Sequence, residues 1–120
     1  MTDSGVEPES SGAQQAPTWH VLCKHADLPT DDSGLGFEVE GRRIALFLHE
    51  GEVHAVDDQC PHSGASLAEG VIRRGEVTCP WHSFHFDLCT GRNADGLAMR
   101  IRVHSAHVRD DGSVEVAVKS

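Results

Sequence analysis

The stretch that decides the fold is CPHSGASLAEGVIRRGEVTCPWH, residues 60–82. It begins with a cysteine and a histidine on either side of one proline, and it ends with a cysteine and a histidine on either side of a proline and a tryptophan. The intervening 16 residues suffice for a loop and a hairpin, and a hairpin brings its two ends together. Proline stiffens each half, because its ring fixes φ. The sequence therefore predicts two rigid loops that present four metal ligands toward one point: Cys60, His62, Cys79 and His82.

These four side chains suit two kinds of metal centre. A tetrahedral zinc site takes two cysteines and two histidines, but it usually pairs like ligands on separate elements, as C-x2–4-C and H-x3–5-H. Each half of this motif instead pairs one cysteine with one histidine. A binuclear [2Fe–2S] centre, in which two cysteines bind one iron and two histidines bind the other, accommodates that division directly. The residues favour the binuclear centre and leave structural zinc as the alternative.

Short strands separated by turns extend from this stretch in both directions. Alternating apolar residues predict strands at 19–23, 84–91 and, in three parts, 35–58. Hairpins are predicted over 71–79 and 99–119, and glycine-containing pairs mark the breaks and turns at Glu40-Gly41, Glu50-Gly51, Arg74-Gly75 and Asp111-Gly112. No segment has a sustained 3.6-residue period, although 25–31 fits a single helical turn. The sequence predicts an all-β fold, a small antiparallel sandwich or barrel.

The first 17 residues differ in composition from the rest of the chain. They are rich in Ser, Gly, Gln, Pro and Glu, which bury too little surface to offset the entropy of ordering, so a disordered tail is expected. They contain neither a basic n-region nor an apolar h-region, so no secretory signal is expected and the protein is predicted to be cytoplasmic. Residues 18–120 are then one domain.

The net charge indicates which partners are expected, and the cysteine content indicates how the cysteines are used. The 120 residues carry 19 acidic and 10 basic side chains, a formal net charge of −9, which argues against nucleic acid and against an anionic membrane surface. The acidic balance suits docking on a basic partner, although Asp57, Asp58 and Glu69 beside the first loop are expected to be solvated charges. Four cysteines in a cytosolic chain indicate metal rather than disulfides.

The pattern C-P-H…C-P-W-H closely resembles the Rieske motif C-x-H…C-x-x-H. The flanking runs DQCPHSGASLAEG and TCPWHSFHFDLCTGR resemble Rieske ferredoxins and the small subunits of NADH-dependent nitrite reductases. The resemblance implies an antiparallel β-sandwich or barrel with a small cluster-binding subdomain, whose loops lie within about 57–92. It also implies one [2Fe–2S] cluster per chain, with the buried iron on Cys60 and Cys79 and the outer iron on His62 and His82.

Departures from high-potential members of this family bear on the reduction potential. Those members resemble C-T-H-x-G-C and C-P-C-H-G-S-x-Y, and the positions of their two extra cysteines hold Ala65 and Trp81 here. The positions of the Ser and Tyr hydroxyls hold Phe84 and Phe86. Fewer donors to the cluster stabilise its reduced state less, so a potential at the low end of the Rieske range is expected.

The resemblance implies a one-electron carrier, monomeric when free, that passes electrons from a flavin-dependent reductase to a terminal oxygenase. The chain shows neither a further 2-His-1-carboxylate domain nor a G-x-G-x-x-G fingerprint, so it is not expected to be an enzyme by itself. A permanent small subunit on the large subunit of a nitrite reductase is one alternative. A zinc-stabilised interaction module is the other.

Overall fold

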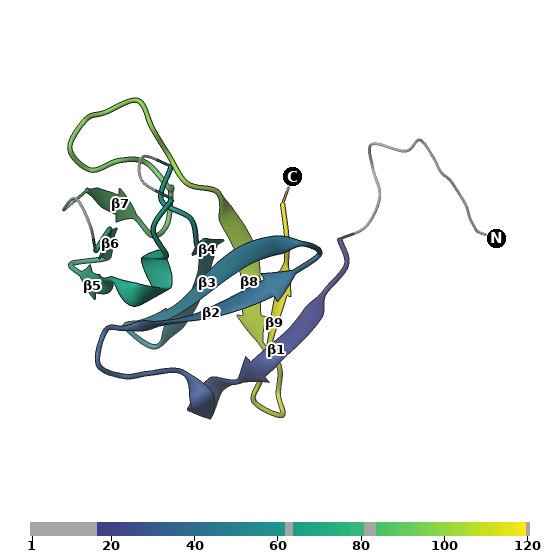
Figure 1. The fold of residues 1–120 in the computed structure, drawn as a ribbon. Coiled ribbons are helices and arrows are strands. Elements are labelled where there is room, and N and C mark those ends of the chain that lie inside the picture. The colour runs from purple at the N-terminus through teal and green to yellow at the C-terminus, as the bar shows by residue number, and fades with distance from the viewer. Residues whose placement is uncertain (1–16, 62–63, 81–83, 120) are drawn as a thin grey trace.

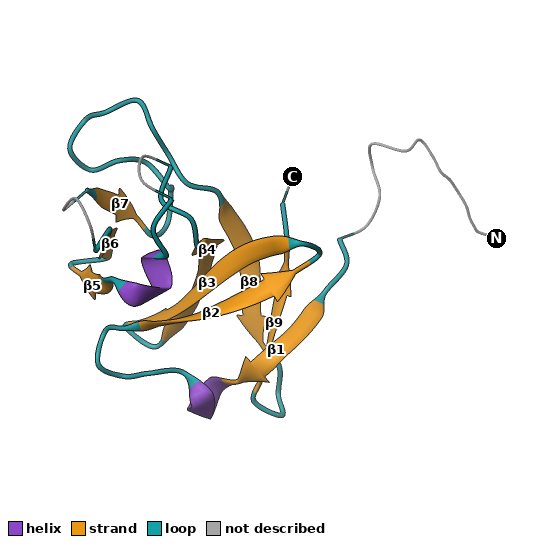
Figure 2. Ribbon diagram, viewed as in Figure 1, coloured by secondary structure: helices purple, strands orange, loops and turns teal. Residues whose placement is uncertain are grey.

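In the computed structural model, residues 17–61, 64–80 and 84–119 are described, and within them nine strands form two antiparallel sheets (Figure 1). The strands are β1 (His20–Lys24), β2 (Gly34–Val39), β3 (Arg42–His49), β4 (Glu52–Asp57), β5 (Val71–Arg73), β6 (Glu76–Thr78), β7 (His85–Asp87), β8 (Val103–Val108) and β9 (Ser113–Ala117). Two short 3-10 helices, η3 (His25–Asp27) and η4 (Leu67–Glu69), complete the elements (Figure 2). Of the tail expected over residues 1–17, residues 1–16 lie outside this description, as do 62–63, 81–83 and 120.

The larger sheet has the order β1-β9-β8-β4-β3-β2 and forms a nearly closed barrel. The smaller sheet has the order β5-β6-β7 and lies at one end of the barrel, with the long loop after β7 above it (Figure 1). An isolated bridge from Ser33 to Val71 joins the segment before β2 to the small sheet. The predicted all-β class and the small second subdomain are therefore confirmed.

Three tight turns set the register of the hairpins. Each consists of a non-glycine residue followed by glycine, with both φ angles positive, as a type I′ hairpin turn requires. The φ pairs are 53° and 77°, 53° and 80°, and 56° and 78° for Glu40-Gly41, Glu50-Gly51 and Arg74-Gly75. These are three of the four positions at which the sequence predicts breaks or turns, so the strand boundaries around them follow from local chemistry.

The last hairpin differs from the prediction. Strand β8 begins at Val103, and its turn is longer than two residues, since the Arg109 N–H donates to the Ser113 carbonyl at 2.8 Å. Residues 99–102 form no regular strand, because the Arg102 N–H donates to the Asp57 carboxylate at 3.1 Å rather than to a neighbouring strand. This segment instead borders the end of the molecule that carries the two cysteine loops.

Two apolar clusters make up the core. One fills the barrel between β2, β3 and β9 and centres on Ile44, Leu46 and Val116, all fully buried. The other joins the barrel to the small sheet, and it contains Cys60 and Cys79 among buried aliphatic and aromatic side chains. The bases of both predicted metal-binding loops are thus part of the hydrophobic core.

His104 is a buried polar residue between β4 and the C-terminal segment. Its Nε2 lies 2.8 Å from Asp57 Oδ1, and its Nδ1 accepts a hydrogen bond from the Lys119 N–H at 3.0 Å. Because Nδ1 accepts, the neutral tautomer with the proton on Nε2 satisfies both partners. Burial lowers the pKa of His104 below its ordinary value, despite the opposing effect of the Asp57 carboxylate.

This lowered pKa makes the stability of the protein depend on pH. Below about pH 6.5 the unfolded chain binds a proton at His104 that the folded chain does not, so the free energy of unfolding falls as the pH falls from there to the folded-state pKa. We expect this loss to reach at most about 1.4 kcal/mol per pH unit. Urea unfolding of the wild type and of His104→Gln at pH 7.5 and 5.5 measures it as the difference between the two proteins. An identical pH dependence in both would contradict the assignment.

Candidate metal centre

Two loops of the same design carry the predicted cysteines. The Cys60 N–H donates to the Ala65 carbonyl at 2.9 Å, and the Cys79 N–H donates to the Phe84 carbonyl at 2.8 Å. Each loop therefore starts at a cysteine, continues with proline and is closed by a bond to the fifth residue after that cysteine. The two similar segments of the sequence therefore form two loops, each closed by its own backbone hydrogen bond of the same type.

The two cysteines lie at the buried inner ends of these loops. Cys60 and Cys79 are each 1% exposed, and both belong to the core cluster that also holds Phe86, Leu88 and Ile101. The structure thus brings together two of the four predicted ligands. The other two, His62 and His82, lie outside the described residues, and among the residues that are described no group of three or more metal-binding side chains gathers.

The small sheet fixes the spacing of the two loops. Strand β6 is its central strand, with Thr78 paired to Val71 on one side and to His85 on the other, and Cys79 follows Thr78 directly. The first loop leads through η4 to Gly70, which passes close against the same strand. A Cβ atom at Gly70 would lie 1.9 Å from the Thr78 carbonyl oxygen, so only glycine fits there. Its φ is −86°, so Gly70 is needed for this close approach and not for a positive φ angle.

Asp58 braces the first loop from beneath, and sequence reasoning missed this role. Its carboxylate is almost completely buried and accepts hydrogen bonds from the Ser66 hydroxyl at 2.9 Å, the Ala68 N–H at 2.8 Å and the Arg43 guanidinium at 3.0 Å. Its main chain adds bonds to Arg43 and Leu67. Asp58 is therefore a structural anchor, which corrects the expectation of a solvated charge. The signal for this role in the sequence was an aspartate two residues before Cys60, followed by a serine eight residues after that aspartate.

Removing this carboxylate should loosen the first loop. We expect Asp58→Ala to lower the free energy of unfolding by about 3 kcal/mol, because hydrogen bonds to a charged group are worth about 1.5–3 kcal/mol each and the buried Ala68 N–H loses its acceptor. Asp110→Ala, which removes an exposed carboxylate near the β8–β9 turn, is the matched control and should change stability by less than about 0.5 kcal/mol. Urea denaturation measures both, and equal effects would contradict the anchoring role.

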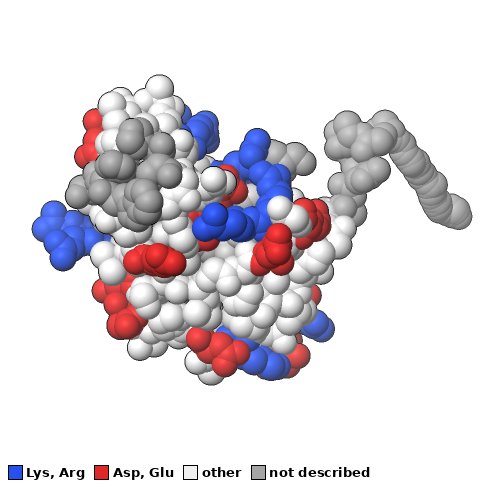
Figure 3. All heavy atoms as spheres, in the orientation of Figure 1, with Lys and Arg blue, Asp and Glu red and all other residues white. Residues whose placement is uncertain are grey.

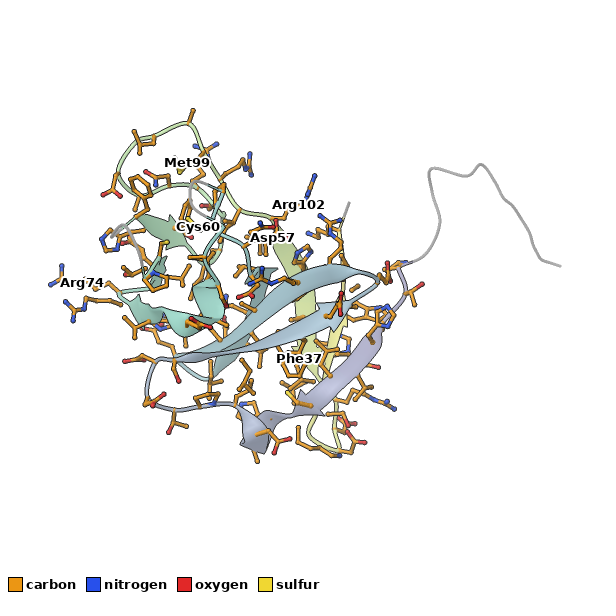
Figure 4. The ribbon with its side chains drawn as sticks, viewed as in Figure 1. Phe37, Asp57, Cys60, Arg74, Met99 and Arg102 are labelled. Atoms are coloured by element: carbon orange, nitrogen blue, oxygen red, sulfur yellow. The ribbon has the colours of Figure 1, made fainter. Side chains whose placement is uncertain are left out.

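Asp57 is likewise engaged rather than simply solvated. Its Oδ1 is hydrogen-bonded to His104 Nε2, and its Oδ2 accepts a hydrogen bond from the Arg102 N–H. Asp57 therefore links the end of β4 to the start of β8. At the end of β7, Asp87 Oδ1 accepts hydrogen bonds from the N–H groups of Cys89 and Thr90, where the long loop that returns to Arg100 begins. Figure 4 shows Met99 of that loop above Cys60, and Met99 packs against the same core cluster.

The aromatic residues of the second loop offer no hydroxyl groups. Phe86 is fully buried in the cysteine cluster, and Phe84 packs against it from a partly buried position. His85, between them, places its Nδ1 3.0 Å from the Thr78 hydroxyl across the small sheet, as suits an ordinary strand histidine. The side chains beside the cysteines are therefore mainly apolar, which agrees with the absence of Ser and Tyr at these positions.

The donor chemistry is compatible with an iron–sulfur cluster. Thiolates are the ligands of such clusters, and a Rieske centre needs two thiolates on one iron and two imidazoles on the other. Two buried cysteines on matched loops supply the inner pair, and each loop carries one further histidine in sequence. Burial of the thiolates among apolar side chains is favourable only when a cation compensates their charge.

Comparisons with known proteins bear on this arrangement. The sequence profile of the Rieske [2Fe-2S] domain matches residues 18–106. The ferredoxin component of the naphthalene 1,2-dioxygenase system of Pseudomonas aeruginosa is 42% identical over 66 residues, which are 55% of this chain and 62% of that protein. The matched stretch thus spans about three fifths of that relative.

Solved structures resemble the whole domain. A protein assigned as the small subunit of an NADH-dependent nitrite reductase of Mycobacterium tuberculosis has a TM-score of 0.81 and 29% identity, covering 88% of this chain and 99% of the other. A chain from the complex of reduced oxygenase and oxidised ferredoxin in carbazole 1,9a-dioxygenase has a TM-score of 0.74 and 28% identity, covering 82% and 92%. The family profile spans most of the chain, the fold agrees, and the paired cysteine loops have the required chemistry, so the chain belongs to the Rieske [2Fe-2S] domain family.

Proposed function

We propose that Cys60, His62, Cys79 and His82 hold one Rieske-type [2Fe–2S] cluster, with the cysteines on the inner iron and the histidines on the outer. The observation that carries this is the pair of loops with the same closure at the two buried cysteines. When bound, the cluster supplies reversible one-electron chemistry. The chain holds the inner thiolates in the core, excludes water from them and keeps the two loops at a fixed spacing.

We propose that the protein is a one-electron carrier between a flavin-dependent reductase and a terminal oxygenase, and that it catalyses no reaction alone. The relative from Pseudomonas aeruginosa is a ferredoxin component, and one structural neighbour is seen in a complex of oxygenase and ferredoxin. Its proposed location is the cytoplasm, where cysteines stay reduced and available for iron. No helix among the described residues is long and apolar enough to cross a membrane.

A permanent nitrite reductase subunit is the second candidate, favoured by the TM-score of 0.81 to such a small subunit. The two candidates differ in assembly. A carrier exchanges partners and is a monomer when free, whereas a subunit stays bound to its large partner. Size-exclusion chromatography of the tagged protein, isolated from its own host, distinguishes them by whether it elutes alone or with a large subunit.

A reductive titration tests the carrier function itself. The purified protein should accept one electron per chain from dithionite and return it to hexacyanoferrate(III) without forming any other product. The midpoint should lie at the low end of about −150 to +300 mV, because Phe84 and Phe86 lack hydroxyl donors. Uptake of no electrons, as for a zinc module, would overturn the proposal.

A further inference from the structure

Basic side chains concentrate on one surface beside the first cysteine loop, although the chain as a whole is acidic. Five of its ten Lys and Arg residues line two adjoining cavities of about 570 and 660 Å³: Arg42, Arg43, Arg100, Arg102 and Lys119. We call these five residues the basic surface. The first cavity is also lined by Cys60, Pro61 and Gly64, so the basic surface borders the loop that begins at Cys60.

The figures show the same concentration. In Figure 3, the largest group of Lys and Arg side chains lies in the upper middle of the visible face, with Asp and Glu side chains at its border, and smaller Lys and Arg groups lie at the left and at the bottom. Figure 4 shows Arg102 at the same end of the molecule as Cys60, and Arg74 on the far side of the small sheet. The positive charge near Cys60 is therefore local.

Two of these side chains are held in place by groups that leave their charge intact. The Arg42 guanidinium donates to the Lys119 carbonyl at 3.0 Å, and the Arg100 guanidinium donates to the Thr90 carbonyl at 3.5 Å. A main-chain carbonyl orients a guanidinium without neutralising it. Arg100 and Arg102 are exposed, so their charges face solvent, whereas the exposed Arg43 is paired with the Asp58 carboxylate at 3.0 Å.

The acids of this region neutralise only part of its positive charge, because Asp58 pairs with Arg43 alone among the five basic residues. Asp58 is buried and bonded to Ser66 and Ala68 as well as to Arg43, and Asp57 is bonded to His104 and the Arg102 N–H. On the turn next to Arg42, Glu40 pairs with His20 at 2.7 Å. The cavity linings therefore present five cations, one of which is paired with the buried Asp58, and the single carboxylate of Asp57.

We propose that the basic surface docks an acidic surface of a redox partner protein and holds it against the loop that begins at Cys60. This deepens the proposed function, on which it rests, by stating the charge of the partner. It also reverses the expectation, drawn from the net charge of −9, that the partner is basic. Complementary charge beside a cluster-binding loop raises the rate at which the two proteins meet, and it orients the partner on that loop.

Electron transfer to an acidic protein of known structure tests the proposal. The dithionite-reduced holoprotein is mixed by stopped flow with oxidised cytochrome b5, an acidic haem protein, over a range of salt concentrations. Arg100→Glu/Arg102→Glu reverses two charges in the basic surface. Lys24→Glu/Arg109→Glu makes the same change in net charge near the β8–β9 turn, at the opposite end of the barrel (Figure 1). Arg100→Gln/Arg102→Gln replaces the first variant if that one fails to assemble its cluster.

At low ionic strength the Arg100→Glu/Arg102→Glu variant should reduce cytochrome b5 about tenfold or more slowly than the wild type, and the control no more than about threefold more slowly. The Gln pair should fall between them, and the difference should vanish near 1 M salt, where the screening length is about 3 Å. Equal rates for the basic-surface and control variants would overturn the inference. Reduction of hexacyanoferrate(III) by the wild type tests the carrier function separately, and its failure would instead overturn the proposed function.

Discussion

Cys60→Ser and Cys79→Ser are each expected to yield protein without visible absorbance and with iron and sulfide at background. Each cysteine is buried at the base of its loop, and no other described cysteine lies in the same core cluster. A serine hydroxyl is a much weaker ligand for a cluster that is normally held by thiolates. Iron, acid-labile sulfide and the visible spectrum of freshly purified protein measure the loss.

The exposed Cys89 provides the matched control for these variants. It follows β7 outside the core cluster, with its N–H bonded to Asp87, and Cys89→Ser should retain full colour and full iron content. Normal cluster content in Cys60→Ser or Cys79→Ser would show that the buried pair does not hold the iron. Loss of the cluster in all three variants would point instead to a general effect on folding.

Gly70→Ala is expected to lower the free energy of unfolding by about 3 kcal/mol or more, because a new methyl group would overlap the Thr78 carbonyl oxygen. Neither side can yield easily: Thr78 lies in the central strand of the small sheet, and Gly70 is fixed by its N–H bond to the Leu67 carbonyl at 2.9 Å. The overlap should push the first loop away from the second. Cluster content should therefore fall together with stability.

Gly36→Ala is the control for this substitution. Gly36 lies within β2, and a Cβ atom there would make only ordinary contacts at 3.7 Å to Ala68 and 3.8 Å to Asp58. Adding the methyl group should change stability by less than about 1 kcal/mol and leave the cluster in place. Urea denaturation and iron content of both variants compare them, and a stable, fully loaded Gly70→Ala protein would refute the close-approach argument.

Much of the fold was predictable because short-range chemistry determines it. The X-Gly pairs at residues 40, 50 and 74 need positive φ angles, and only a few hairpin turns accept them, so the strands on either side are fixed locally. The cysteine loops were predictable for a similar reason. Ligand type, spacing and proline together leave few metal centres that the loops can build.

The remaining features depend on contacts between distant segments. Gly70 touches Thr78 only because two strands and η4 fold back on one another, and Asp58 is buried only because Arg43, Ser66 and Ala68 converge on it. Charge counting over the sequence likewise gives one sum for the whole chain. It cannot show that residues 42–43, 100–102 and 119 meet beside Cys60.

The assignment of one Rieske centre per chain is the central claim, and low-temperature EPR of the dithionite-reduced protein tests it most directly. We predict a rhombic signal that integrates to one spin per chain, with an average g value well below that of the free electron. Pulsed EPR should resolve couplings to two imidazole nitrogens, and both should be lost when His62 and His82 are replaced. A colourless, EPR-silent protein that contains one zinc ion per chain would contradict the account.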